Sequence, residues 1–256
     1  MTGYANVNGL KLYYEEHGLG RKGEDRPLVL LPGGILTIPL TFDTVLPALV
    51  TDRRVIAVEL QGHGHTADID REPTIPNLAS DVVGLLDELG VDRADLLGFS
   101  LGGGVALELA VTHPDRVGDL VVASAPHRWF ETYYPEIRTA DPNSPRMPTA
   151  KHFAQMRESY RLVAPDPDHF DDFRMNQSAV VATFEGWTDE QIATIAARTL
   201  LICGDTDFMP VAAVADTQRL IPGAQLAVLP NTTHMDVMHR TELIVALLRE
   251  FCAPGR

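Results

Sequence analysis

The sequence predicts an α/β fold in which a mostly parallel, eight-stranded sheet carries helices on both faces. Short apolar runs alternate with helical segments along residues 28–124 and again along residues 188–256, as is typical of parallel sheets. The runs are apolar throughout, as expected of strands that are buried on both faces. Residues 125–187 interrupt this alternation. We therefore expect one core domain, formed by residues 1–124 and 188–256, with an insertion at residues 125–187.

The first two strands are predicted to form a hairpin at one edge of the sheet. Asn8-Gly9 lies between strand-like runs at residues 3–7 and 11–17, and Asn-Gly in that position strongly indicates a hairpin turn. The following segment, residues 18–26, is charged and rich in glycine, and we expect a surface loop there.

Hydrophobic periodicity predicts the remaining elements. Buried strands are expected at residues 28–31, 54–59, 94–99, 117–123, 199–203 and 225–229. Helices are expected at residues 42–50, 75–89, 102–113, 149–162, 168–184, 210–220 and 241–251. One more helix should begin at Thr188, because Thr188-Asp189-Glu190-Gln191 has the pattern of a capping box.

The insertion at residues 125–187 differs in composition from the rest of the chain. It contains seven prolines and no clear strand, but it is rich in aromatic residues. A flexible linker would not carry so many aromatic side chains. We therefore expect a small packed unit built on its two predicted helices.

Composition excludes several classes of partner. The net charge is −14, whereas nucleic acids and anionic membranes are bound through clustered cationic side chains, so neither partner is expected. No apolar run approaches the ~20 residues of a membrane span, and the first residues lack the pattern of a signal peptide. A cytoplasmic location is expected. His63 and His65 have no third ligand at useful spacing, and no metal or cofactor is expected; the sequence does not indicate an oligomeric state.

The stretch Gly98-Phe99-Ser100-Leu101-Gly102 indicates a catalytic serine. It lies between a predicted strand and a predicted helix, where a Gly-x-Ser-x-Gly turn holds the serine hydroxyl above the sheet. The glycines leave room for the neighbouring backbone, and the following N–H groups lie at a helix N-terminus, which favours negative charge. We interpret Ser100 as a nucleophile rather than as a helix cap.

A serine nucleophile needs a base and a carboxylate that orients the base. Reactive groups of open parallel sheets gather at the carboxyl ends of the strands. Asp205 and Asp207 follow the penultimate predicted strand, and His234 follows the last one. His239 also follows the acid, but it lies beyond that loop, which favours His234. The order of serine, acid and histidine is that of α/β-hydrolases.

The chain resembles the serine hydrolases of the α/β-hydrolase fold nearly from end to end. The resemblance is carried by the Gly98–Gly102 turn, Gly204-Asp205-Thr206-Asp207, Thr233-His234 and Gly62-His63-Gly64. In this family the acid is the second carboxylate of the Gly-Asp-x-Asp turn, which implies a catalytic triad of Ser100, Asp207 and His234, with Asp205 as the structural alternative. The resemblance also implies that residues 125–187 form a helical cap over the pocket, and that His63 has a structural or pocket-rim role.

The resemblance further implies an oxyanion hole. Its donors would be the N–H of Leu101 and one N–H of the loop Pro32-Gly33-Gly34-Ile35, where Gly34 matches the family. The family commonly has a histidine that supports this loop at the position of Pro32. Ile35 therefore stays open as the alternative donor, and so does a plain glycine turn.

Apolar side chains near the predicted triad are expected to line the pocket. They leave the strand end nearest the nucleophile or adjoin the loops of the acid and the histidine: Trp129, Phe130, Tyr133, Phe208, Met209 and Met235. Such a lining favours a small to medium, largely apolar substrate over a sugar or a phosphate ester. The sequence thus predicts a serine hydrolase that cleaves a small-molecule carboxylic ester through an acyl-enzyme.

Three alternatives remain at this point. The layout and the cap resemble carbon–carbon hydrolases that act on ring-cleavage products, and the glycine-rich run after Ser100 resembles cofactor-free perhydrolases. A ligand-binding protein without catalysis also occurs on this fold, so the fold alone does not establish activity. Epoxide and haloalkane hydrolases are disfavoured because they need a carboxylate at position 100.

Overall fold

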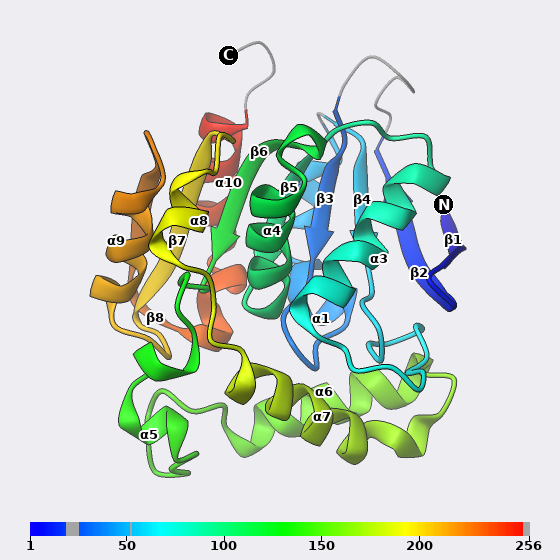
Figure 1. Cartoon of the computed structure of the whole chain (residues 1–256). Helices are drawn as coiled ribbons and strands as arrows, with labels where there is room; N and C mark the ends of the chain where they lie inside the picture. The colour runs from blue at the N-terminus through cyan, green and yellow to red at the C-terminus, as the bar shows by residue number, and fades with distance from the viewer. Residues whose placement is uncertain (19–25, 52, 253–256) are drawn as a thin grey trace.

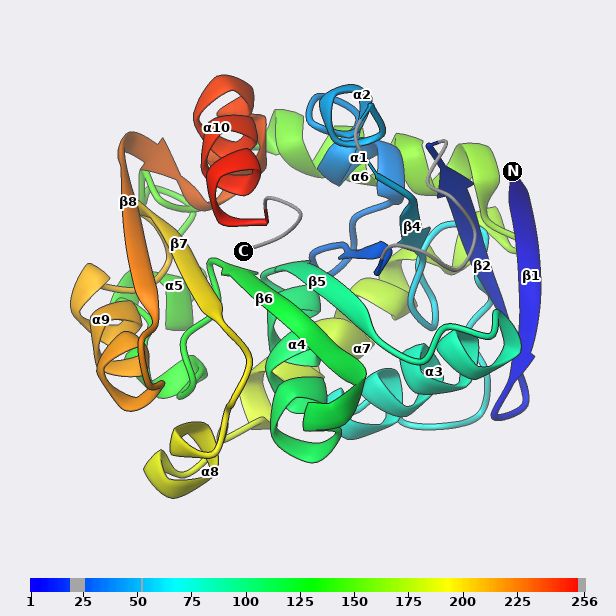
Figure 2. The ribbon, with the colours of Figure 1, turned by 90° about the horizontal axis from the view of Figure 1, so that it is seen from above.

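One sheet of eight strands runs through the computed structural model, which describes residues 1–18, 26–51 and 53–252 (Figures 1 and 2). The strands are β1 (Thr2–Val7), β2 (Leu10–His17), β3 (Leu28–Leu31), β4 (Val55–Val58), β5 (Ala94–Phe99), β6 (Val117–Ala123), β7 (Thr199–Thr206) and β8 (Gln225–Thr233). Their order is β1-β2-β4-β3-β5-β6-β7-β8. The pairs β1–β2 and β2–β4 are antiparallel and all other pairs are parallel. The predicted mostly parallel, eight-stranded sheet is confirmed.

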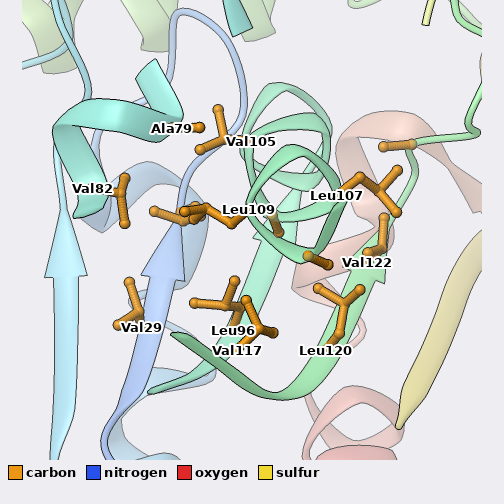
Figure 3. Packing of buried hydrophobic residues seen from close by; sticks show 14 of the residues in the cluster. Val29, Ala79, Val82, Leu96, Val105, Leu107, Leu109, Val117, Leu120 and Val122 are labelled. Carbon is orange, nitrogen blue, oxygen red and sulfur yellow. The ribbon is translucent and has the colours of Figure 1, made fainter. Parts of the chain in front are cut away.

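Helices cover both faces of the sheet (Figure 2). One face carries α3 (Ile75–Glu88), α4 (Leu101–Thr112), α8 (Asp189–Ala193) and α9 (Val211–Leu220), and the other carries α1 (Ile38–Phe42), α2 (Leu46–Leu49) and α10 (Thr241–Phe251). Neighbouring residues of a strand point to opposite faces. Leu96 packs with α3 and α4 (Figure 3), whereas Leu97 packs with the cluster around α1 and α10. Burial on both faces explains why the strands are apolar throughout.

Two local predictions are confirmed in detail. Asn8 and Gly9 connect β1 to β2 with φ values of 50° and 83°, the positive pair that a type I′ hairpin turn requires. Thr188 and Gln191 make both hydrogen bonds of the capping box at the start of α8. The surface loop expected at residues 18–26 falls almost entirely outside the described residues.

The prediction of a single helix at residues 42–50 is wrong. The chain forms two short helices instead, α1 and α2, and α1 begins before the expected start. Pro39 and Pro47 each occupy the first turn of one of these helices, where a missing N–H costs no hydrogen bond. Inside a longer helix Pro47 would remove a hydrogen bond and clash with the preceding turn, so the helix must restart there.

The inserted segment forms a helical layer across the carboxyl ends of the parallel strands (Figure 1). It contains α5 (Pro135–Arg138), α6 (Ala150–Val163) and α7 (Phe170–Thr183). The last two match the predicted helices, whereas α5 was not expected. No helix among the described residues combines the length and the apolar character needed to cross a membrane.

Candidate active site

Ser100 occupies a strained turn between β5 and α4. Its φ of 51° and ψ of −114° lie in a region of backbone conformation that residues other than glycine rarely adopt. The glycines on either side are sterically required. A Cβ on Gly98 would lie 2.1 Å from the Gly102 carbonyl oxygen, and one on Gly102 would lie 2.2 Å from a carbonyl oxygen at the end of β3. The turn therefore places the Ser100 side chain at the carboxyl edge of the sheet, where it is half-buried.

The structure brings Asp207 and His234 to the same edge. Strands β7 and β8 are longer than expected: β7 ends directly before Asp207, and β8 ends directly before His234. His234 Nε2 lies 3.0 Å from Ser100 Oγ, and His234 Nδ1 lies 2.6 Å from Asp207 Oδ1. Because a carboxylate only accepts hydrogen bonds, Nδ1 carries the proton of the neutral ring and Nε2 is an acceptor. The arrangement can therefore take the proton of the serine hydroxyl.

Asp207 is a buried carboxylate with a full set of hydrogen bonds. Besides His234, its oxygens accept from the Ser124 hydroxyl at 2.6 Å, from the Phe208 N–H at 2.7 Å and from the Gly204 N–H at 3.3 Å. Burial by itself raises the pKa of Asp207, but the charge and hydrogen bond of His234, with the hydrogen bonds of Ser124 and Phe208, hold it below its usual value.

Ser124 is a site residue that the sequence reasoning missed. It directly follows β6, with a φ of 57°. Its position at the end of a parallel strand, at the same edge as Ser100, was the one feature that could have indicated it.

The two alternative triad residues lie elsewhere. Asp205 is exposed, and its carboxylate accepts from the backbone N–H groups of Asn231 and Thr232 at 2.9 and 3.0 Å, which ties β7 to the end of β8. His239 is also exposed, and its Nδ1 donates to the Met235 carbonyl oxygen at 2.9 Å. Neither contacts Ser100 or His234 in the hydrogen bonds of the described residues.

The loop after β3 passes beside the serine turn. A Cβ on Gly34 would lie 3.7 Å from the Leu101 Cβ, so the two proposed oxyanion donors belong to adjacent segments. The N–H of Ile35, the alternative donor, instead donates to His63 Nε2 at 3.2 Å.

His63 is fully buried, and its Nδ1 donates to the Gln61 carbonyl oxygen at 3.0 Å. Burial lowers the pKa of His63 from 6.5 to about 4, so the ring is neutral at pH 7. The nearby carboxylate of Glu59, also buried, accepts from the Ile38 N–H at 3.2 Å and from His65 Nδ1 at 2.9 Å. The two histidines of the Gly-His-Gly-His turn therefore bind protein groups around the loop after β3.

The predicted pocket residues divide into two sets, and the first lies next to the histidine. The Phe208 ring stacks on the His234 ring with centroids 3.8 Å apart. Tyr133 lies 6.3 Å from Phe208, and Phe130 lies 6.3 Å from Tyr133, again between ring centroids. These aromatic side chains thus form a continuous path from the inserted segment to His234.

The second set packs in the two hydrophobic clusters on either side of the sheet. The buried Trp129 lies over α4, where a Cβ on Gly104 would be 2.3 Å from its ring, and it packs perpendicular to the Phe184 ring. Met209 is buried in the same hydrophobic cluster as Trp129, and the half-buried Met235 packs against the cluster on the other face of the sheet. Their place in the pocket stays a prediction.

Arg146, in the inserted segment, contacts the loop that carries Asp207. Its Nη1 donates to the Asp207 carbonyl oxygen at 2.9 Å, and its guanidinium lies 4.0 Å from the centre of the Tyr134 ring. The N–H of Tyr134 in turn donates to the Phe208 carbonyl oxygen at 3.0 Å. These contacts connect residues 134–146 to the segment that carries Asp207.

The chain is similar in sequence and in fold to known proteins. A model of the alpha/beta hydrolase family matches residues 28–247. The putative carbamate hydrolase RutD of Caulobacter sp. (strain K31) is 28% identical over 87% of this chain and 88% of its own. A pimeloyl-[acyl-carrier protein] methyl ester esterase of Neisseria meningitidis serogroup B is 30% identical over 84% of this chain and 88% of its own. A meta-cleavage product hydrolase from Pseudomonas fluorescens IP01 has a similar fold, with a TM-score of 0.81, 22% identity and coverage of 99% of this chain and 98% of its own.

Proposed function

The chain belongs to the alpha/beta hydrolase family, and on that premise we propose that it is a serine hydrolase that cleaves carboxylic esters of small to medium, largely apolar substrates. The observation that carries this proposal is the pair of contacts that His234 makes, at 3.0 Å to Ser100 and at 2.6 Å to Asp207. A serine hydroxyl becomes nucleophilic when a base accepts its proton, and a carboxylate stabilises the imidazolium that results. The hydrogen bonds that lower the pKa of Asp207 keep it ionised for this role.

The proposed reaction has two steps. Ser100 Oγ attacks the ester carbonyl carbon while its proton moves to His234 Nε2, and the same proton is then given to the departing alkoxide, which leaves as the alcohol. Water attacks the acyl-enzyme in the second step, with His234 as the general base. The acid is released and the Ser100 hydroxyl is regenerated.

We assign two N–H groups as the hydrogen-bond donors that stabilise the negative charge on the carbonyl oxygen. Leu101 supplies one, at the N-terminus of α4, where the helix dipole favours negative charge. Gly34 is assigned as the other, because the Ile35 N–H already donates to His63 and the Gly34 backbone lies beside Leu101. Removing a single donor of this kind costs about 10²–10³ in kcat in other enzymes, so the assignment has measurable consequences.

The substrate class rests on the side chains around His234 and on the relatives. Phe208, Tyr133 and Phe130 offer an apolar path beside the histidine, and we assign residues 125–187 as the cap that encloses the substrate. One relative is described by a methyl ester and another by a carbamate. Both groups contain a carbonyl carbon bonded to oxygen, which supports the ester assignment over a phosphate ester or a glycoside.

Substitution of Ser100 tests this function. The Ser100→Ala variant should lower hydrolysis of p-nitrophenyl butyrate by at least about 10³-fold, because no other group supplies the attacking oxygen. Ser80→Ala is a matched control, because Ser80 is exposed on α3. Activity of Ser100→Ala near that of the control would refute the assignment.

The same preparations separate the rival functions. Each preparation is assayed for hydrolysis of p-nitrophenyl esters and of a 2-hydroxy-6-oxodienoate. It is also assayed for peroxide-dependent halogenation and for labelling by a fluorophosphonate. If the protein hydrolyses no ester, turnover of the dienoate would identify a carbon–carbon hydrolase, and peroxide-dependent halogenation would identify a perhydrolase. Either result would refute the proposed reaction. Failure of all of them, including the label, would favour a ligand-binding protein.

A further inference from the structure

Residues 32–35, in the loop between β3 and α1, have a backbone conformation that their own side chains cannot stabilise by hydrogen bonds. Ile35 has a φ of 58°, in the left-handed region that β-branched residues rarely adopt. This loop spans residues 32–37, and its first part consists of Pro32, Gly33, Gly34 and Ile35, whose side chains cannot form a hydrogen bond. A side-chain hydrogen bond that fixes residues 32–35 must therefore come from outside this segment.

His63 supplies that group from the turn after β4. Its Nε2 accepts the hydrogen bond of the Ile35 N–H at 3.2 Å, and its Nδ1 donates to the Gln61 carbonyl oxygen at 3.0 Å. Because a carbonyl oxygen only accepts, the Gln61 contact fixes the tautomer in which Nε2 is the acceptor. The Phe173 ring from α7 packs nearly perpendicular to the imidazole, with centroids 4.8 Å apart. Both the place and the tautomer of the ring are thus determined.

We propose that His63 is a positioning residue of the oxyanion hole. By binding the Ile35 N–H it turns that group away from Ser100 and sets the preceding peptide so that the Gly34 N–H faces the developing oxyanion. The role rests on the proposed function, because the oxyanion forms only if Ser100 attacks a carbonyl carbon. His63 touches neither substrate nor Ser100 in this scheme and acts through Ile35 alone.

Two polar variants that differ only in reach test this role. In His63→Gln the side-chain amide oxygen extends to about the place of Nε2, whereas in His63→Asn it reaches only the place of Nδ1. We expect His63→Asn to lower kcat for p-nitrophenyl butyrate and the rate of Ser100 phosphonylation by roughly 10-fold to 100-fold, with KM changed by less than about threefold. His63→Gln should stay within about threefold of the wild type in both rates.

Controls separate positioning from general destabilisation. His127→Asn removes another buried histidine, whose partners are Thr217 and Asp189, and it should leave both rates unchanged at a temperature where each variant is folded. In the His63→Asn background, Ile35→Gly should restore part of the lost rate, because glycine adopts a positive φ without strain.

The outcomes distinguish this role from the proposed function. Equal rates for the asparagine and glutamine variants, or no recovery with Ile35→Gly, would overturn the positioning role while the ester hydrolase stands. A wild type that hydrolyses no ester but is phosphonylated at Ser100 would overturn the proposed function, and the phosphonylation rates of the variants would still decide the role of His63. A wild type with neither activity overturns both.

Discussion

Replacing His63 with glutamine is expected to reduce the loss in the free energy of unfolding that occurs as the pH falls below 6.5. Burial lowers the pKa of His63 from 6.5 to about 4, so between these values the unfolded chain binds a proton that the folded chain does not. The stability that the neutral ring contributes is therefore fully present above pH 6.5 and is lost as the pH falls towards 4. At 1.36 kcal/mol per pKa unit this amounts to about 3 kcal/mol over the whole interval and about 2 kcal/mol between pH 7.5 and pH 5.

Urea unfolding at these two pH values measures the effect. The free energy of unfolding of the wild type should fall between pH 7.5 and pH 5 by about 2 kcal/mol more than that of His63→Gln. Other groups, such as His127 and Asp207, are present in both proteins, so their contributions cancel in this difference. An equal fall in both proteins would refute the reasoning, because it would mean that His63 is protonated as readily in the folded chain as in the unfolded one.

Three further substitutions test the site around Ser100. Asp207→Asn should lower kcat by roughly 10³–10⁴-fold with little change in KM, because an amide can stabilise the wrong tautomer of His234; steady-state kinetics with a loss below tenfold would contradict the assignment of the acid. Ser124→Ala should lower the free energy of unfolding at pH 7 by about 1–3 kcal/mol, because buried Asp207 loses a hydrogen bond; unchanged urea unfolding would contradict it. Gly98→Ala should yield little folded protein, because the new Cβ would lie 2.1 Å from the Gly102 carbonyl oxygen; a wild-type Tm would show that the turn packs differently.

The parts of the fold that the sequence predicted are those encoded by neighbouring residues. Asn8-Gly9 requires two positive φ values whatever surrounds it, and the capping box at Thr188 closes within one helical turn. The strands are apolar throughout because both faces are covered, and this leaves a clear pattern in the sequence. The serine turn was predictable for the same reason, since its glycines, Ser100 and the flanking elements are contiguous.

The parts that the sequence did not predict depend on contacts between distant segments. Ser124 reaches Asp207, and His63 reaches Ile35, only because parallel strands end side by side. In the amino-acid sequence, polar residues at such places cannot be told from ordinary loop residues. The direction of the Trp129 ring, which packs over α4, was not predictable either, because the direction of a side chain in an irregular segment is set by tertiary packing.

The central claim is that Ser100 is the nucleophile, and covalent labelling tests it most directly. The protein is treated with a fluorophosphonate, digested and mapped by mass spectrometry while residual hydrolysis of p-nitrophenyl butyrate is followed. We expect one phosphonyl group per chain, on Ser100, with activity lost in proportion to labelling. Full activity after complete labelling of Ser100, or inactivation with the label on another residue, would contradict it.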